Sequence, residues 1–300
     1  MKIVGDQLQV AGSIDFEANP TFELNIQVTD AGGLSYIKAV TVTVNDVNEN
    51  PTAINLSATD INENNASGAV VATLSAVDPD GAASGFAGPF TYELVTGTGD
   101  TDNGSFTIVG DTLQINDPAN FEGQNSFDIR LRVTDNGGLT FETTETITIN
   151  DVNEDPTDIA LSASNVDENS AADTVIATLT TVDPDGAASG FAGPFTYELV
   201  TGDGSNDADN GLVKIVGDQL QVAGSIDFET NPTLELNLQV TDAGGMTYTE
   251  AVTITVNDIN EVPTDITLSA SDVDENVASG TVIATLSTVD VDAGDTFTYA

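Results

Sequence analysis

The stretch FDIRLRV, at residues 127–133, alternates strictly between apolar and charged side chains. FELNIQV at 22–28 and LELNLQV at 234–240 repeat this alternation. Because successive side chains of a β-strand point to opposite faces, the pattern predicts strands with one buried and one wet face. We count about seven such strands in roughly 100 residues and find no helical period, so the sequence predicts tandem immunoglobulin-like Greek-key β-sandwiches.

The phrase DVNENP at 46–51 returns as DVNEDP at 151–156 and as DINEVP at 258–263. Residues 77–97 are identical to 182–202, and residues 3–17 are identical to 215–229. Such self-similarity predicts an end-to-end array of repeats. We expect the C-terminal half of a repeat at 1–51, complete repeats at 52–156 and 157–263, and the N-terminal half of a repeat at 264–300.

The composition excludes several classes of function. The chain has 49 acidic and 5 basic residues, a formal net charge of −44, and neither Cys nor His. A surface of this charge repels nucleic acid and anionic lipid, and thiolate or imidazole metal sites are ruled out. No apolar run is long enough for a membrane-spanning segment. A folded chain with so many carboxylates predicts bound cations, which reduce their mutual repulsion.

Acidic motifs recur at fixed places in each repeat. They are an E-N pair (63–64, 168–169, 275–276), a D-x-D motif (78–80, 183–185, 290–292), IDFE or NFE (14–17, 120–122, 226–229) and TD-x-GG (29–33, 134–138, 241–245). TD-x-GG is also typical of a hairpin turn. Calcium takes six to eight oxygen ligands from carboxylates, amides and carbonyls. The motifs therefore predict Ca²⁺ as the cofactor.

These motifs, in this order, resemble cadherin-type repeats as found in bacterial surface proteins, and the resemblance covers nearly the whole chain. It implies Ca²⁺ at each junction between repeats, with ligands from the end of one repeat, the linker and the top of the next. The implied ligands of the first junction are Asp15, Glu17, Asn48, Glu49, Asp78, Asp80 and Asp135. Those of the second are Glu63, Asn120, Glu122, Asn153, Glu154, Asp183, Asp185 and Asp242, and those of the third are Glu168, Asp227, Glu229, Asn260, Glu261, Asp290 and Asp292.

The sequence departs from the family pattern at three places. Asn120 replaces the aspartate of D-x-E, Val262 stands at the fifth linker position, and glutamate replaces the usual aspartate at the fourth. Asn120 keeps an oxygen ligand but removes a charge, and the longer glutamate side chain is expected to change affinity.

The resemblance predicts a calcium-rigidified extender or adhesion segment of a large bacterial surface or secreted protein, in an extracellular location. Its expected partners are calcium ions, neighbouring repeats and other cell-surface proteins or polysaccharide, and not nucleic acid. We expect no enzymatic activity, because the acidic pairs recur in every repeat and no catalytic motif is present.

One alternative is a carbohydrate-binding accessory module of a polysaccharide-degrading protein. Exposed aromatic side chains would favour it, and the candidates are Tyr36, Phe86, Phe141, Phe191 and Tyr248. The acidic loops at 97–104 and 202–211 do not match the EF-hand template, and we interpret them as solvated loops.

Overall fold

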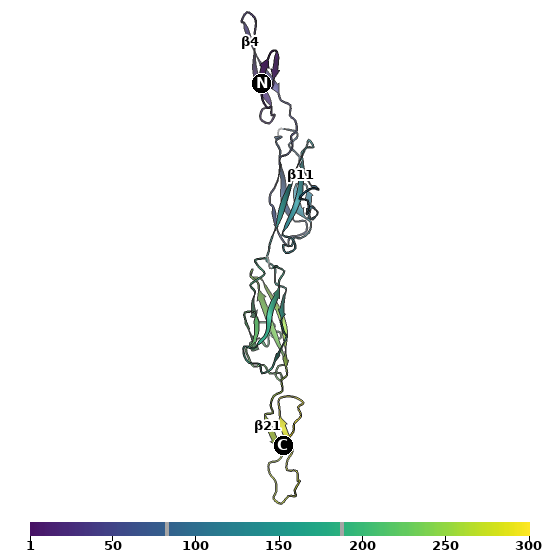
Figure 1. Ribbon diagram of the computed structural model, residues 1–300, viewed down its shortest axis with the longest axis vertical. Helices are drawn as coiled ribbons and strands as arrows, with labels where there is room; N and C mark the ends of the chain where they lie inside the picture. Colours follow the sequence, from purple (N-terminus) through teal and green to yellow (C-terminus); the bar gives the residue numbers. More distant parts are fainter. Residues whose placement is uncertain (82–83, 187–188) are drawn as a thin grey trace. The chain divides into compact units, whose positions relative to one another are not determined.

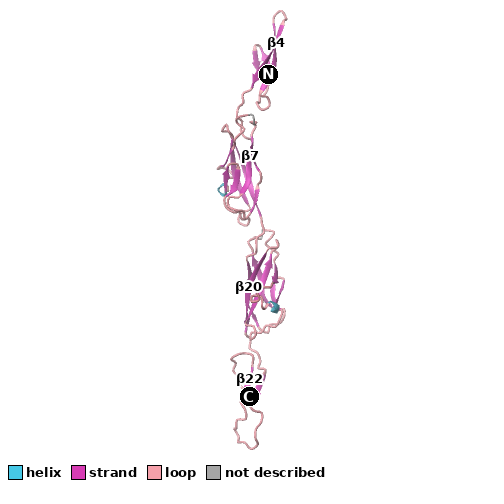
Figure 2. Cartoon of the chain, turned by 180° about the vertical axis from the view of Figure 1, so that it is seen from behind, coloured by secondary structure: helices cyan, strands magenta, loops and turns pink. Residues whose placement is uncertain are grey.

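The computed structural model describes residues 1–81, 84–186 and 189–300. Strands dominate these residues, and the two helices described are single 3-10 turns, η1 (Asn103–Ser105) and η2 (Asn210–Leu212) (Figure 2). The chain divides into two compact units, Met1–Val152 and Asn153–Ala300. Over the described residues, no helix has the length and apolarity to cross a lipid bilayer.

The first unit contains one complete sandwich, which carries the label β11 in Figure 1. One sheet has the order β5-β7-β10-β9 and the other β6-β12-β11-β8. The strands are β5 (Ala53–Leu56), β6 (Asp60–Asn62), β7 (Val70–Val77), β8 (Thr91–Leu94), β9 (Phe106–Val109), β10 (Thr112–Ile115), β11 (Ser126–Thr134) and β12 (Thr140–Asn150).

The second unit repeats this topology with sheets β13-β15-β18-β17 and β14-β20-β19-β16. The strands are β13 (Asp158–Leu161), β14 (Asn165–Asp167), β15 (Val175–Val182), β16 (Thr196–Leu199), β17 (Val213–Val216), β18 (Gln219–Val222), β19 (Thr233–Thr241) and β20 (Thr247–Asn257). The predicted all-β sandwich class is confirmed.

The described residues of each sandwich form eight strands, where the sequence patterns predict about seven. The first segment of the sandwich forms two short strands, one in each sheet. β5 pairs antiparallel with β7, and β6 pairs parallel with β12 in the other sheet. The parallel register joins Asn62 to Asn150, the last residues of β6 and β12. Parallel strands that end together bring the residue after β6 to the segment after β12, which is the DVNEDP linker.

The alternating strands supply the core as predicted. Ile129, Leu131 and Val133 of β11 are completely buried, and so are the four apolar residues of β19 from Leu234 to Val240. Phe106 and Phe127 add an edge-to-face ring contact with centroids 5.6 Å apart, a favoured aromatic geometry.

Shorter sheets lie toward the two ends of the described chain. They pair β1 (Lys2–Val4) with β2 (Gln7–Gln9), β3 (Thr21–Thr29) with β4 (Ser35–Thr43), and β21 (Asp265–Leu268) with β22 (Leu286–Val289). Val28 of β3 is 63% exposed, whereas its equivalent Val240 is fully buried. The two-stranded β3–β4 sheet therefore keeps the alternating pattern but leaves apolar side chains such as Val28 exposed.

Truncating a core leucine tests this assignment. Leu131→Ala leaves a cavity between the sheets of the first sandwich, and such changes cost about 2–5 kcal/mol of unfolding free energy. We expect its urea midpoint, followed by circular dichroism, to fall sharply. Val109→Ala, at a position 56% exposed in the same sandwich, is the control. Equal midpoints for the two variants would contradict the assignment.

Candidate metal centre

The glutamates of the first two E-N pairs, Glu63 and Glu168, are buried where the last strand of each sandwich passes into the linker. Glu63 directly follows β6 and is 3% exposed. Its carboxylate accepts hydrogen bonds from the amides of Val152, at 2.8 Å, and Phe121, at 2.7 Å. Its own amide donates to the Asn150 carbonyl at 3.1 Å. The parallel pairing of β6 and β12 thus holds this carboxylate against the linker and the NFE segment.

The second unit builds the same arrangement. Glu168 is 3% exposed and accepts hydrogen bonds from the amides of Ile259, at 2.6 Å, and Phe228, at 2.9 Å. The asparagine of the pair has a backbone role, since Asn64 and Asn169 both have φ of 56°. Asparagine adopts this left-handed conformation more readily than most residues. This explains why asparagine follows the glutamate in the motif.

Other carboxylates gather around these glutamates. Glu63 lies with Glu122 and Asp151, and Glu168 lies with Glu229 and Glu261. In each group, one carboxylate oxygen per residue lies within 4.8 Å of the others. A third group of the same tightness joins Glu17, Asp46 and Asp80 in the first unit. Each group places like charges at distances where they repel strongly.

The D-x-D motif of the first unit meets the TD-x-GG turn and the linker. Asp78, Asp80 and Asp135 form another group within 4.8 Å, and Asp80 and Asp135 are 1% and 6% exposed. The linker reaches both motifs, because the Glu49 amide donates to Asp80 Oδ2 at 2.9 Å and Asn48 Nδ2 donates to Asp135 Oδ2 at 3.0 Å. These contacts bring five predicted residues of the first junction together, and Glu17 joins them through its group with Asp80.

In the second unit the same contacts recur. The Glu154 amide donates to Asp185 Oδ2 at 2.9 Å, and Asn153 Nδ2 donates to Asp242 Oδ2 at 3.0 Å. The Asp185 amide donates to Asp183 Oδ1 at 3.0 Å, which orients the D-x-D loop.

The paired glycines of TD-x-GG have separate roles. The second, Gly138 or Gly245, has φ above 90°, where a side chain is strained. The first is packed against the linker asparagine, since a Cβ on Gly137 would lie 2.3 Å from Asn48 Oδ1, and one on Gly244 would lie 2.0 Å from Asn153 Oδ1. The predicted TD-x-GG turn therefore also packs against the side chain of the linker asparagine.

Buried oxygen atoms without a hydrogen-bond donor mark these ends of the repeats. They are Asp46 Oδ1, Asn48 Oδ1, Asp78 Oδ2, Asn153 Oδ1, Asp183 Oδ2, Glu261 Oε2 and Asp290 Oδ2. Buried acceptors are normally satisfied, so each needs a partner. Carboxylate and amide oxygens are the ligands that Ca²⁺ prefers, and the residues fit this ion without any nitrogen or sulfur donor.

Burial and neighbouring charge act on the D-x-D aspartates. Burial raises the pKa of Asp78 above its ordinary value, and the charges of Asp80 and Asp135 raise it further, against a lowering by the hydrogen bond from the Asp80 amide. Asp183 shows the same direction, again with burial as the largest cause. In the linker, burial raises the pKa of Glu49, and Glu17, Asp80 and Asp15 add to the effect.

The first residue of each IDFE or NFE motif makes a local bond as well. Asp15 Oδ1 accepts from the Ala18 amide, Asn120 Oδ1 from Gly123 and Asp227 Oδ1 from Thr230. The hydrogen bond from Asn169 lowers the pKa of Glu261, but burial and the charges of Glu168, Asp292 and Asp227 raise it above its ordinary value. Asn120 thus fills the same turn position as the two aspartates.

At the third junction, the Glu261 amide donates to Asp292 Oδ2 at 2.7 Å, and the Asp292 amide donates to Asp290 Oδ1 at 3.3 Å. Asn260 differs from the other linker asparagines, since its Nδ2 donates to the Glu261 carbonyl. The predicted residues of this junction otherwise gather as those of the first do.

The sequence-based ligand set omitted the first aspartate of the linker motif. Asp46 and Asp151 each lie in a three-carboxylate group, and burial and the charges of Asp292 and Glu168 raise the pKa of Asp258. The signal was available, because an aspartate opens all three copies of the linker phrase.

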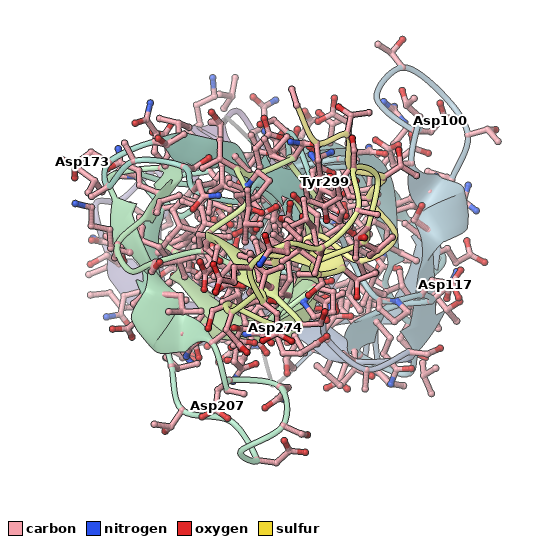
Figure 3. All side chains as sticks on the ribbon, turned by 90° about the horizontal axis from the view of Figure 1, so that it is seen from below. Asp100, Asp117, Asp173, Asp207, Asp274 and Tyr299 are labelled. Carbon is pink, nitrogen blue, oxygen red and sulfur yellow. The ribbon has the colours of Figure 1, made fainter. Side chains whose placement is uncertain are left out.

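The acidic loops at 97–104 and 202–211 stand apart from these centres. Figure 3 shows Asp100 and Asp207 on loops that project from the strands. Asp100 Oδ2 accepts from the Gly97 amide, and Asp207 accepts from the amides of Gly202 and Gly204. These aspartates hold the turns of their own loops.

No protein-family model matches the sequence. Rat protocadherin Fat 2 is 28% identical over 312 residues, covering 98% of this chain and 7% of that protein. Human cadherin-4 is 28% identical over 311 residues, covering 95% of this chain and 34% of that protein. The chain therefore spans a minor part of the curated relatives that it matches.

Solved structures show the fold. The protocadherin gamma B4 extracellular domain has a TM-score of 0.65 at 23% identity, covering 94% of this chain and 45% of that one. Domains 1–4 of protocadherin gamma B7 have a TM-score of 0.65 at 21% identity, covering 95% of this chain and 71% of that one. The chain therefore shares the fold of these extracellular domains.

The contact between Gly244 and Asn153 provides a first test of the candidate metal centre. Gly244→Ala forces the Asn153 side chain away from Asp242, although alanine suits the backbone there. We expect calcium affinity in the second unit to fall about tenfold, because supporting contacts of metal ligands typically contribute 10–100-fold. Gly211→Ala, where no atom lies within 4 Å of the added Cβ, is the control. Equal affinity of the two variants, measured by calorimetric titration, would contradict the contact.

A second test uses pH. A carboxyl group whose pKa is raised by folding binds its proton more tightly in the folded state, so its stabilisation is complete below the unfolded pKa and is lost as pH rises through the folded pKa. Asp78 and Asp183 have this sign. Metal-free protein should therefore melt at a higher temperature near pH 4, close to the ordinary aspartate pKa, than at pH 7. The difference should shrink in Asp78→Asn/Asp183→Asn but not in Asp117→Asn, and a melting temperature that rises with pH would contradict this.

Proposed function

We propose that this chain is a calcium-binding segment of a large extracellular or secreted surface protein, in which Ca²⁺ at the junctions between repeats stiffens an extender or adhesive array. The repeats are those at 1–51, 52–156, 157–263 and 264–300. The similar proteins are cadherins and protocadherins, which supports an adhesive, non-catalytic role at the cell surface.

One observation carries this proposal: buried oxygens that lack donors lie beside grouped carboxylates. In the first junction, Asp78 Oδ2 and Asn48 Oδ1 are such oxygens, and Asp80 and Asp135 lie next to them. A calcium ion supplies positive charge and accepts several oxygens at once, which reduces the repulsion among the carboxylates.

The proposed ligands of the first junction are Asp15, Glu17, Asn48, Glu49, Asp78, Asp80 and Asp135, with Asp46 added. In the third they are Glu168, Asp227, Glu229, Asn260, Glu261, Asp290 and Asp292, with Asp258 added. For the second junction, the proposed ligands are those that the sequence motifs imply, from Glu63 to Asp242. The sequence alone supports them. Extracellular modules bind Ca²⁺ at roughly 10⁻⁴ to 10⁻³ M, so the array would be stiff outside cells and loose where calcium is scarce.

The carbohydrate-binding alternative lacks a specific supporting observation. Phe141 and Tyr248 pack against the cores of their sandwiches, and Phe86 and Phe191 are half-buried. Tyr36, which is 67% exposed, lies on the two-stranded β3–β4 sheet. A bacterial source remains a prediction from the sequence resemblance, and the relatives named above are from rat and human.

Calorimetric titration of chelator-stripped protein with Ca²⁺ tests the function. We expect saturable binding of several ions with a rise in melting temperature, because a ligand at 100 times its dissociation constant adds about 2.7 kcal/mol to stability. Mg²⁺ should bind more weakly, since it loses its water ligands reluctantly.

Two variants assign the ions to the acidic centres. Asp80→Asn removes a charge from the first junction and should abolish part of the bound calcium, whereas Asp117→Asn, at an exposed loop position (Figure 3), should leave it unchanged. An absence of saturable binding by the unmodified protein would overturn the proposal. Equal loss in both variants would show that calcium binds only to diffuse surface charge.

A further inference from the structure

A serine follows the D-x-D motif in both complete repeats and contacts its second aspartate. Ser84 Oγ donates to Asp80 Oδ1 at 3.3 Å, and Ser189 Oγ donates to Asp185 Oδ1 at 3.2 Å. Each hydroxyl in turn accepts a hydrogen bond at 3.0 Å from the amide two residues later, that of Phe86 or Phe191. The backbone thus orients the hydroxyl toward the carboxylate.

The two oxygens of each aspartate are held from different directions. Asp80 Oδ1 accepts from Ser84, while Oδ2 accepts from the Glu49 amide of the linker. The exposed fractions of Asp80 and Asp185 are only 1% and 2%. A carboxylate oxygen has two acceptor sites, so these bonds fix the direction of the side chain and leave sites for a metal ion.

The segment after the serine also contacts the TD-x-GG turn. The Asn136 side chain donates to the Gly85 carbonyl at 2.8 Å, and its amide donates to the Phe86 carbonyl at 3.4 Å. In the second unit the Ala243 amide donates to the Phe191 carbonyl at 3.2 Å. The segment therefore ties the D-x-D motif to the turn that carries Asp135 or Asp242.

The third copy of D-x-D provides an internal comparison. Asp292 is followed by Ala293, Gly294 and Asp295, and no serine stands in this stretch. Asp292 still accepts from the linker amide of Glu261, but it is only partly buried, unlike Asp80 and Asp185. The linker contact is thus common to all three copies, whereas the serine contact occurs in two.

We propose that Ser84 and Ser189 are positioning residues that hold Asp80 and Asp185 in the direction required for calcium binding. Fixed ligands lose less conformational freedom when the ion binds, and contacts that orient metal ligands typically change affinity by 10–100-fold. This inference rests on the proposed calcium function and adds a determinant of affinity outside the ligand set.

The test is calorimetric calcium titration of Ser84→Ala/Ser189→Ala. We expect calcium affinity to fall about tenfold, with the melting temperature in chelator nearly unchanged, because each serine adds only one loop hydrogen bond to the metal-free fold but sets the direction of a metal ligand. Ser84→Thr/Ser189→Thr, which keeps both hydroxyls, should restore most of the affinity. Ser205→Ala is the matched control, since its hydroxyl donates to Asp203 at 2.6 Å in the loop at 202–211, and its affinity should equal that of the unmodified protein.

The outcomes separate the two proposals. Calcium binding by the unmodified protein, with equal affinity in the double alanine variant, would overturn the positioning role alone. A loss of affinity accompanied by an equal fall in metal-free stability would also overturn it, because the serines would then be structural. If the unmodified protein fails to bind calcium, both proposals fall.

Discussion

The mutual repulsion of buried carboxylates is the constraint on which the ends of these repeats depend. Two unit charges about 4 Å apart repel by about 4 kcal/mol at an effective dielectric constant near 20, a figure that solvent reduces. One oxygen each of Asp78, Asp80 and Asp135 lies within 4.8 Å of the others, and Asp80 and Asp135 are buried. The backbone amides that donate to Asp80 and Glu63 offset part of this cost, and a divalent cation would offset more.

The sandwich topology makes this crowding unavoidable. Because β6 runs parallel to β12 and ends with it, Glu63 is delivered to the start of the linker, and β14 and β20 do the same for Glu168. At the other end of each sandwich, Gly137 and Gly244 allow the linker asparagine to approach the TD-x-GG turn. Packing of the core thus determines which oxygens meet, although no core residue contributes one.

Much of this arrangement is predictable from sequence. The alternation at 127–133 and 234–240 predicts the buried strands, because pleating imposes a period of two. The recurring acids predict which side chains gather, as with Asp78 and Asp80. Single-residue roles are harder, since the parallel pairing that brings Asp151 beside Glu63 joins segments far apart in the chain. Ser84 was missed for a related reason: its recurrence as Ser189 does not show what the side chain contacts, because that contact depends on how the loop folds back.

The most direct test of the central claim is anomalous diffraction from crystals grown with calcium. We expect anomalous density about 2.3–2.6 Å from Asp78 Oδ2 and Asn48 Oδ1, the calcium–oxygen distance in proteins, with a second such site near Asp183 Oδ2. Crystals with no density at these oxygens, or with ordered water alone beside them, would contradict the claim that calcium compensates the buried carboxylates.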